Sequence, residues 1–338
     1  MSAKVSFVVA VYNVAAFVGE CVRSLCEQTM EDIEIVIVDD GSTDGSIEIV
    51  NQVLAQFPHR KKQTNIIRHQ QNMDLPQTRW DGIMAAGGEY IIIVDGDDYV
   101  DQHMAEKLYD KAVETDADMV VCDHWIGMPT CDRVRRMAPD GKEGDNDNLR
   151  EDIINLNVAV NTWCKLVRRT VYTDNDIVWP VKGYAEDVVV STMTAYYSKR
   201  ISYLAEPLYY YRYNPQSYSR GMGVEARLKT FEDYKLNQQI LLKFFEREGL
   251  MEKYEEAVFK GKVRVKKHLL PLFPTRKYVR LYFKTYPEVD RAFLWGNKYR
   301  KPTYRERVWI AALWLGLYPR LKRRLMSKRF RPGKEWLP

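Results

Sequence analysis

The sequence lacks the cysteine and histidine patterns that mark structural metal sites and disulfide scaffolds. Its five cysteines are scattered and include no CxxC pair, and its five histidines show no metal-ligand spacing. A zinc-ribbon or disulfide-stapled domain is therefore not indicated. Scattered cysteines fit a reducing compartment, so we expect a cytoplasmic protein.

Long apolar runs and targeting signals are also missing. No stretch approaches the roughly 18 to 20 apolar residues of a transmembrane helix. Residues 1–13 lack the basic start and small-residue cleavage site of a signal peptide, and we expect them to form a first strand. The string Gly221-Met222-Gly223 does not follow a first strand, which argues against a dinucleotide-dependent oxidoreductase.

The chain does have length, a large apolar fraction and an uneven distribution of charge. Its 338 residues are 46% hydrophobic, which is enough for a large core and two domains. The net charge of +5 comes from one end of the chain. Residues 299–338 hold 12 Lys and Arg against 2 Glu, so the rest of the chain is net negative.

Strand-like and helix-like runs alternate over the first 125 residues. This alternation predicts an α/β fold, a mostly parallel sheet with helices on both faces. Ligands bind outside the carboxyl ends of the strands in such sheets, so the polar clusters after Val9, Val38 and Val94 should share one cleft. The expected strands cover 5–9, 34–38, 65–68, 90–94 and 118–122, and the expected helices cover 15–28, 46–57, 76–86 and 102–115.

Beyond residue 125 the pattern changes twice. Residues 126–150 are loop-like, and residues 159–213 return to strands and one helix. From Glu225 the pattern predicts two successive helices, the second at about 252–269. We therefore place a domain boundary near 215–224.

Three carboxylates follow the apolar run at 90–94, where the expected strand ends. Asp95, Asp97 and Asp98 lie together there, and Gly96 lets the backbone turn sharply. Like charges this close repel one another unless solvent or a divalent cation neutralises them, and carboxylate oxygens suit Mg²⁺ or Mn²⁺. The alternative is an Asp-rich turn without a ligand, because Asp and Gly favour turns in any case.

A second polar cluster follows the expected strand at 34–38. Asp39 and Asp40 lie where a carboxylate can accept a hydrogen bond from a base N–H or a ribose hydroxyl. Tyr12 and Asn13 end the first strand at the same edge of the sheet. Tyr12 could stack on a planar base, although a core tyrosine is an equally ordinary interpretation.

Ordered blocks of sequence follow one another along the chain. They are VSFVVAVYN at 5–13, VDDGSTDGS at 38–46, GEYIIIVDGDD at 88–98, NTWCKLVRRTVY at 161–172, WPVKGYAEDVVV at 179–190 and PLYYYRYNPQSYSR at 207–220. Together these blocks resemble family 2 glycosyltransferases with the GT-A fold, and the third block matches that family's DxD metal motif. The later blocks are similar to bacterial members that build capsules, exopolysaccharides, lipopolysaccharide or teichoic-acid decorations. The resemblance covers residues 4–220.

The resemblance implies a nucleotide-sugar site at the ends of the first strands. Asp40 would contact uracil or another base, with Asp39 beside it and Tyr12 near the ring. Asn13 and Gly96 would belong to the same site.

The resemblance also implies a metal site and a diphosphate site. Asp95 would reach the ribose or the metal ion, Asp97 would bind the Mn²⁺ or Mg²⁺ that bridges the diphosphate, and Asp98 would support the site. Arg79 matches an arginine that helps to position the donor's diphosphate and sugar. A divalent cation held there would stabilise the negatively charged leaving group.

Glu186-Asp187 matches the family's catalytic acidic pair, with Asp187 as the base and Glu186 orienting or binding the acceptor. A carboxylate that takes the proton of a sugar hydroxyl typically contributes about 10²- to 10⁴-fold in rate. Acidic residues at a helix start can also be simple caps. Aromatic faces suit pyranose rings and cations suit phosphate, but core packing and solvated surface are the default interpretations. The acceptor-side candidates are Trp163, Lys165, Tyr184 and Arg220.

Three positions depart from the family pattern. Ala10 stands where the family usually has Pro, Asp74 where it often has Gly, and Trp80 where it often has Asn. The last two would lie close to the donor sugar, so they leave the identity of that sugar open.

The C-terminal segment combines an apolar run with a basic cluster. Residues 308–318 are apolar but too few to span a bilayer, and seven Lys and Arg follow between 320 and 331. Trp and Tyr beside basic residues predict in-plane association of residues 305–331 with an anionic membrane. The alternative is a helix packed on the catalytic domain with a solvated basic end. No RNA- or DNA-binding motif accompanies the charge, so nucleic acid is not an expected partner.

Residues 1–220 are predicted to form a GT-A catalytic domain, with a nucleotide-sugar half at about 1–125 and an acceptor half at about 155–220. Residues 221–338 would form a helical C-terminal region with the membrane-associating tail. We expect an inverting, metal-dependent transfer from a UDP-sugar to a glycan or lipid-linked glycan at the inner face of the cell membrane. The alternatives are a sugar nucleotidyltransferase, against which the lack of a Gly- and Lys-rich triphosphate loop counts, and a non-catalytic membrane-associated adaptor.

Overall fold

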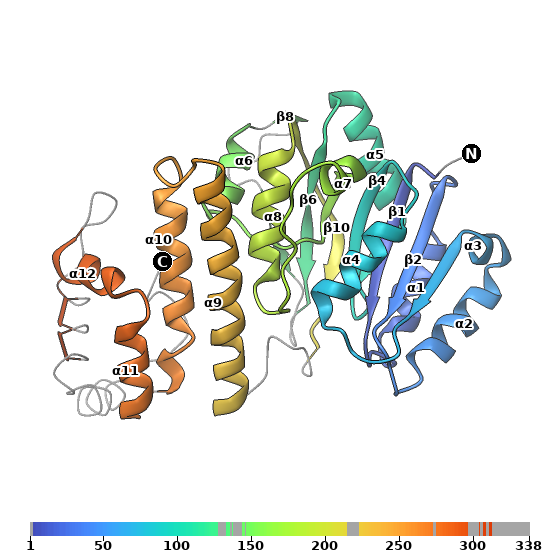
Figure 1. Cartoon of the computed structure of the whole chain (residues 1–338). Coiled ribbons are helices and arrows are strands. Elements are labelled where there is room, and N and C mark those ends of the chain that lie inside the picture. Colours follow the sequence, from blue (N-terminus) through green and yellow to red (C-terminus); the bar gives the residue numbers. More distant parts are fainter. Residues whose placement is uncertain are drawn as a thin grey trace.

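One mixed sheet runs through the molecule, with helices on both of its faces (Figure 1). The computed structural model describes residues 3–127, 133–135, 137, 144–145, 147–214, 223–272, 275–296, 304, 307–308 and 311–312. Within these ranges the strands pair in the order β3-β2-β1-β4-β9-β6-β10-β5, with β7 on β6 and β8 on β10. The strands are β1 (Val5–Val11), β2 (Ile33–Asp39), β3 (Thr64–Arg68), β4 (Tyr90–Asp95), β5 (Tyr99–Val100), β6 (Met119–Ile126), β7 (Arg133–Arg135), β8 (Gly144–Asp145), β9 (Lys165–Arg168) and β10 (Ile201–Tyr211).

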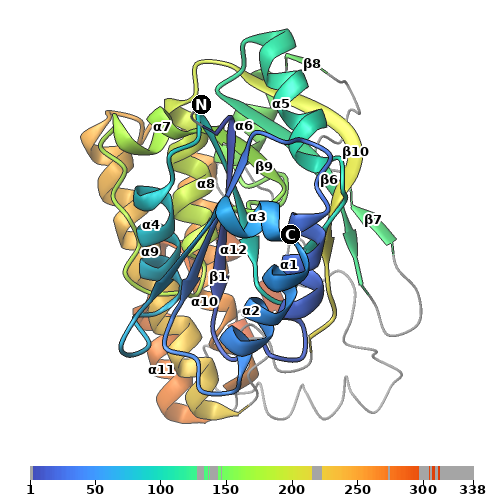
Figure 2. The same cartoon turned by 90° about the vertical axis from the view of Figure 1, so that its right-hand side faces the viewer.

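Two sets of helices cover the sheet. In Figure 2, α4, α7 and α8 lie on one face and α1, α2 and α5 on the other. The helices α9 to α12 extend beyond α8, away from β1 and β2 (Figure 1). The helices are α1 (Val18–Cys26), α2 (Ser46–Gln56), α3 (Pro58–Lys62), α4 (Leu75–Ala85), α5 (Met104–Thr115), α6 (Asp147–Ile154), α7 (Arg169–Thr173), α8 (Glu186–Tyr197), α9 (Val224–Arg247), α10 (Glu255–Lys267), α11 (Arg276–Lys284) and α12 (Pro287–Trp295), with a short 3₁₀ turn at Leu270–Leu272.

The first four parallel strands form where the sequence predicts them. Strands β1, β2 and β4 are almost wholly buried, as expected for apolar runs covered on both faces. Their register places Val11 beside Asp39 and Ala10 beside Asp95, so three neighbouring strands end side by side. The polar clusters after these strands therefore leave the sheet at one edge, as predicted.

The second half of the sheet is mixed. Strand β9 inserts between β4 and β6 and is antiparallel to both, so the parallel run stops at β4. The expectation of a continuous loop over 126–150 is wrong for the described part of that segment. There β7 pairs with the edge of β6, β8 pairs with β10, and α6 begins at Asp147.

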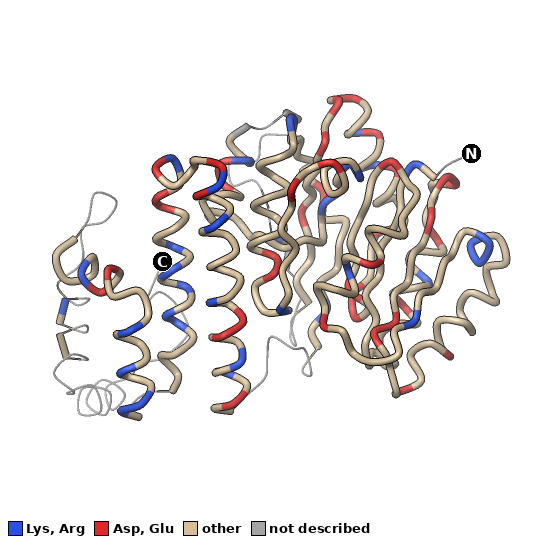
Figure 3. Tube along the Cα trace, viewed as in Figure 1, with Lys and Arg blue, Asp and Glu red and all other residues tan. Residues whose placement is uncertain are grey.

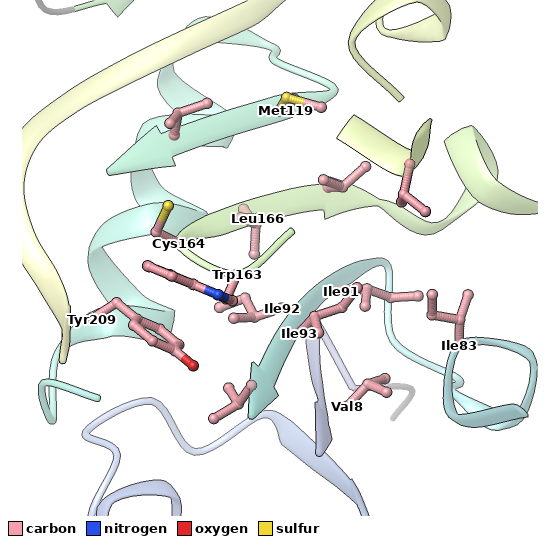
Figure 4. Packing of buried hydrophobic residues seen from close by; sticks show 14 of the residues in the cluster. Val8, Ile83, Ile91, Ile92, Ile93, Met119, Trp163, Cys164, Leu166 and Tyr209 are labelled. Atoms are coloured by element: carbon pink, nitrogen blue, oxygen red, sulfur yellow. The ribbon is translucent and has the colours of Figure 1, made fainter. Parts of the chain in front are cut away.

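The insertion of β9 joins the two halves of the sheet in one apolar core. Figure 4 shows Ile92 of β4, Leu166 of β9 and Met119 of β6 in this cluster, with Trp163 and Tyr209 beside them. The rings of Trp163 and Tyr209 stack, with centroids 4.5 Å apart. The core therefore continues from the predicted nucleotide-sugar half into the predicted acceptor half.

The C-terminal helices are joined by a buried ion pair. Lys266 of α10 donates to the Asp290 carboxylate of α12 at 2.7 Å and to the Thr285 carbonyl at 2.6 Å, and both charged side chains are 2% exposed. Burial lowers the pKa of Lys266 and raises the pKa of Asp290 to about 6. One ammonium group thus ties α10 to the segment that links α11 and α12.

We expect Lys266→Met to lower the free energy of unfolding by about 3–5 kcal/mol, because the Asp290 carboxylate would stay buried without its cation. The double variant Lys266→Met/Asp290→Leu should recover most of this loss, since it removes both buried charges. Guanidinium unfolding at neutral pH, followed by tryptophan fluorescence, measures both variants. A single variant as stable as the wild type would show that the pair contributes nothing to holding these helices together.

Candidate active site

The acidic turn after β4 is held by the end of β1. The Gly96 amide donates to the Ala10 carbonyl at 3.0 Å, and the Asp98 amide donates to the Asp95 carbonyl at 3.0 Å. A Cβ at Gly96 would lie 2.8 Å from the Ala10 carbonyl oxygen, so a side chain does not fit there. The turn therefore holds its three aspartates against the neighbouring strand.

Asp98 is the buried member of the turn. Its carboxylate accepts hydrogen bonds from the Tyr209 hydroxyl at 2.7 Å and from the Arg212 amide at 2.8 Å, and it is 1% exposed. Burial, followed by the charges of Asp97 and Asp95, raises the pKa of Asp98 well above its usual range. Asp98 thus anchors the turn to β10.

Asp97 and Asp95 are more open than Asp98. Asp97 accepts from the Asn214 side-chain amide at 2.9 Å and is partly buried, and 21% of the Asp95 side chain is exposed. Burial raises the pKa of Asp95. Among the described residues, no group of three or more His, Cys, Asp or Glu could hold a metal ion. Two carboxylates still fit Mg²⁺ or Mn²⁺, because such ions often take one or two carboxylates together with substrate phosphates and water.

Arg79 joins this turn to the acidic pair of α8. Its guanidinium donates to Asp95 Oδ1 at 2.6 Å, to Asp187 Oδ1 at 3.3 Å and to Glu186 Oε1, and it is 2% exposed. Burial alone would lower the pKa of Arg79, but the charges of the three carboxylates outweigh burial and raise it well above its ordinary value. One permanent cation therefore holds together acids from two distant parts of the chain.

The two acids that open α8 differ in exposure. Glu186 is 4% exposed, and burial, with the adjacent Asp187 charge, raises the pKa of Glu186 well above 4.5. Asp187 keeps 33% of its side chain exposed and accepts from the Thr162 hydroxyl at 2.9 Å. An incoming hydroxyl can therefore reach Asp187 more readily than Glu186.

The loops after β1 and β2 are tied together. Asp39 is fully buried, and its carboxylate accepts from the Ser42 amide at 2.9 Å and from Arg68 Nε at 3.0 Å. The Asn13 amide donates to Ser42 Oγ at 3.1 Å. Tyr12 is 47% exposed, so its ring is open to a planar ligand and is not a core residue.

Asp40 is held by residues that follow β3. Its Oδ1 accepts from the Met73 amide at 2.7 Å and lies 2.8 Å from His69 Nδ1. The other nitrogen of His69 lies 3.0 Å from Asp81 Oδ2, so one imidazole bridges two carboxylates. These contacts orient the carboxylate that is predicted to meet the base.

Two acceptor-side candidates are packed inside the protein. Trp163 is 7% exposed and stacks on Tyr209 and on Tyr211, with ring centroids 5.3 Å apart in the latter pair. Lys165 is buried on β9 and donates to the Asn161 carbonyl, and burial lowers the pKa of Lys165. The expectation of a solvated Lys165 is wrong, because its strand lies between β4 and β6 inside the sheet.

Of the other two acceptor-side candidates, one packs against the C-terminal helices and the other lies outside the described residues. Tyr184 is partly buried against the C-terminal helices, with its ring 5.0 Å from the His268 ring and 6.2 Å from the Tyr234 ring. Arg220 lies outside the described residues.

The structure shows what two of the residues that depart from the family pattern contact. Asp74 has φ 75° and ψ 151°, a backbone region open essentially to glycine alone, and its carboxylate accepts from the Leu75 amide at 2.9 Å at the start of α4. Trp80 packs on Trp179, with ring centroids 5.0 Å apart. It therefore helps to hold the segment before α8 against α4.

Five residues whose side chains hold the site carboxylates were missed from the sequence. Each comes from a segment distant from its partner, so no local spacing could reveal the contact. Three of them lie in the blocks at 161–172 and 207–220, whose resemblance to the family was the one available signal. The contacts are Arg68 to Asp39, His69 to Asp40, Thr162 to Asp187, Tyr209 to Asp98 and Asn214 to Asp97.

Comparison with known proteins agrees with the fold. The family model described as Glycosyl transferase family 2 matches residues 6–181. EpsJ of Bacillus subtilis (strain 168), named an uncharacterized glycosyltransferase, is 32% identical over 79% of this chain and 76% of its own length. EpsH of the same organism also bears a glycosyltransferase name and is 33% identical over 62% of this chain. The matched part is 60% of EpsH, so the chain spans about three fifths of that relative.

A solved structure supports the fold assignment. S. aureus TarS 1-349, in complex with UDP-GlcNAc, superposes with a TM-score of 0.59 at 21% identity and covers 88% of this chain and 93% of its own. The matched family model spans more than half of the chain, and its residues include the acidic turn and Arg79. The chain therefore belongs to glycosyl transferase family 2 and has the GT-A fold.

Proposed function

We propose that this glycosyltransferase moves a sugar from a UDP-sugar to a hydroxyl of a glycan acceptor, with inversion at the anomeric carbon and with the help of Mn²⁺ or Mg²⁺. The observation that carries the proposal is the contact of one guanidinium, Arg79, with Asp95 on one side and Asp187 on the other. The turn predicted to meet the donor diphosphate and the acid predicted to meet the acceptor thus lie within reach of one reaction centre.

The donor side of the proposal rests on the edge formed by β1, β2 and β4. Asp40 is oriented there by His69 and Met73. The Asp40 amide donates to the Val11 carbonyl at 2.8 Å, and the next residue, Tyr12, exposes its ring. A carboxylate beside an open aromatic ring suits a uracil base. The TarS structure that shares the fold holds UDP-GlcNAc, which favours UDP as the nucleotide of this chain.

Asp97 and Asp95 would hold the divalent cation. When bound, such an ion offsets the charge that develops on a departing diphosphate. The residues of the chain have three further tasks. Asp98 and Tyr209 keep the turn in place, Arg79 keeps Asp95 and the acidic pair together, and Asn214 orients Asp97.

The transfer itself would be a single displacement. The acceptor oxygen bonds to the anomeric carbon as the bond from that carbon to the diphosphate oxygen breaks, and the electron pair leaves with the nucleoside diphosphate. The hydroxyl proton passes to the Asp187 carboxylate. Because Glu186 is buried and its pKa is raised, we assign it to holding Arg79 and orienting Asp187 rather than to proton removal.

We expect Asp187→Asn to lower kcat by about 10²- to 10⁴-fold with little change in UDP affinity, because only the base is removed. Asp97→Asn should instead weaken metal-dependent UDP binding. Nucleotide-sugar hydrolysis and transfer with Mn²⁺, together with calorimetry of UDP binding, separate the two effects. Asp176→Asn is the matched control, since Asp176 is exposed and its backbone carbonyl accepts from Arg247 at the end of α9.

Full transfer activity in both site variants would show that the acids are assigned wrongly. Release of pyrophosphate from a nucleoside triphosphate and a sugar phosphate would identify a nucleotidyltransferase. A protein without Mn²⁺- or Mg²⁺-dependent UDP binding would be the non-catalytic adaptor.

The raised pKa of Glu186 predicts a pH-dependent stability difference. A carboxyl whose pKa is higher in the folded state costs stability as the pH rises from its ordinary value of 4.5 towards the raised one. Glu186→Gln removes that cost, so its stability relative to the wild type should increase with pH, by at most about 1.4 kcal/mol per pH unit. Urea unfolding from pH 4.5 to 8 measures this, with the exposed Glu246→Gln as control. A difference that stays constant with pH would contradict it.

We propose that the enzyme acts at the inner face of the cell membrane, in the synthesis of a cell-surface polysaccharide. Residues 305–331, the predicted contact, lie almost entirely outside the described residues. Among the described residues, no helix is long and apolar enough to cross a membrane. Helix α11 adds to the basic character of this end, because Arg276, Lys277, Arg280 and Lys284 are all exposed on it (Figure 3).

Binding to anionic vesicles tests this proposal. Each basic residue near an anionic surface contributes about 1 kcal/mol, so Arg323→Gln/Arg324→Gln should weaken binding to vesicles of phosphatidylglycerol and phosphatidylcholine by roughly tenfold or more. The control, Lys61→Gln/Lys62→Gln, removes the same charge from exposed positions on α3. Equal sedimentation of the wild type and both variants would contradict a membrane role for the tail.

A further inference from the structure

The loop that leads into the acidic pair is held by a residue of the C-terminal helices. Asn237 lies on α9, is 1% exposed, and its side-chain amide donates to the Lys182 carbonyl and to the Tyr184 carbonyl, each at 2.9 Å. Both of its N–H bonds are therefore used on one short segment. That segment ends at Glu186, the first residue of α8.

The opposite side of the same loop rests on α4. A Cβ placed on Gly183 would lie 2.6 Å from Asp74 Oδ1, so the loop backbone passes close to the carboxylate that caps α4. The loop from residue 182 to 185 is thus held between Asp74 of the donor half and Asn237 of α9. Two separate elements fix its position.

The residue between the loop and the two acids has an unfavourable backbone conformation. Ala185 is in the left-handed conformation, with φ 64° and ψ 22°, which a residue with a side chain adopts at a cost in free energy. This conformation turns the chain so that Glu186 and Asp187 point at Arg79. Without support, relaxation at Ala185 would let the two like-charged acids move apart from the guanidinium.

We propose that Asn237 is a positioning residue for catalysis, which acts through the Lys182 and Tyr184 carbonyls to set the placement of Glu186 and Asp187. The inference rests on the proposed role of Asp187 as base. It makes α9 part of the catalytic apparatus rather than a support for the fold alone. The donor side, formed by β1, β2 and β4, does not contain α9 and should be unaffected.

The chain offers a matched control in the next residue. Gln238 is 2% exposed on the same helix, and neither of its polar atoms has a hydrogen-bond partner among the described residues. Gln238→Met keeps the length of the side chain and alters burial and polarity without touching the loop. If Asn237 acted only in packing, substitutions at Asn237 and at Gln238 would change kcat to a similar extent. A positioning role predicts that only substitutions of Asn237 lower kcat.

The decisive experiment compares Asn237→Leu with Gln238→Met. For Asn237→Leu we expect kcat for sugar transfer to fall at least tenfold, since a shift of about 1 Å can cost 10²-fold. The KM for the UDP-sugar and the affinity for UDP with Mn²⁺ should stay within twofold of the wild type. Amide hydrogen exchange of residues 181–188 should accelerate in this variant alone.

Asn237→Asp provides a second variant that retains size and polarity but presents an acceptor to the two carbonyls, and it should behave like Asn237→Leu. Unchanged kcat in either folded variant would overturn the proposal, as would an equal loss of kcat in Gln238→Met. A parallel loss of UDP affinity, or failure of both Asn237 variants to fold, would assign Asn237 to the fold instead. If the wild type does not transfer sugar at all, the proposed function fails, while the hydrogen-exchange comparison still tests the contact with the loop.

Discussion

The buried guanidinium of Arg79 is the contact on which the arrangement of the site depends. It binds Asp95 at the end of β4 and both acids at the start of α8, across 107 residues of sequence in the case of Glu186. Three carboxylates in a space of low dielectric would repel one another without it. Arginine suits this task because its planar group stays charged and presents donors in several directions.

The sheet has to bring the two halves close enough for that contact. Strand β9 does so by inserting antiparallel between β4 and β6, so that the residues just before it, 161–164, lie towards the end of β4 that carries the acidic turn. Thr162 then reaches Asp187, and Trp163 packs on Tyr209, whose hydroxyl binds Asp98. The short segment that holds Thr162 and Trp163 therefore contributes both to the polar site and to the apolar core.

Much of the donor side could be predicted from local pattern. Strands β1, β2 and β4 are continuous apolar runs, and the carboxyl ends of parallel neighbours meet at one edge whatever the details of packing. The acceptor side was less accessible. Lys165 looked like a surface cation, because nothing within its own segment indicates that β9 lies inside the sheet. The same limit applies to Thr162 and Asn237, whose partners lie 25 and 53 to 55 residues away.

The sequence by itself determined which acids lie at the ends of which strands, because strand position follows from hydrophobic periodicity over a few residues. Its resemblance to a family led to the family assignment, which the comparisons bear out. Only the tertiary structure decided which carboxylates share Arg79, which of the acidic pair stays exposed, and which helix holds the loop before them. These properties depend on burial and on hydrogen-bond partners from remote segments, and no spacing along the chain encodes such contacts.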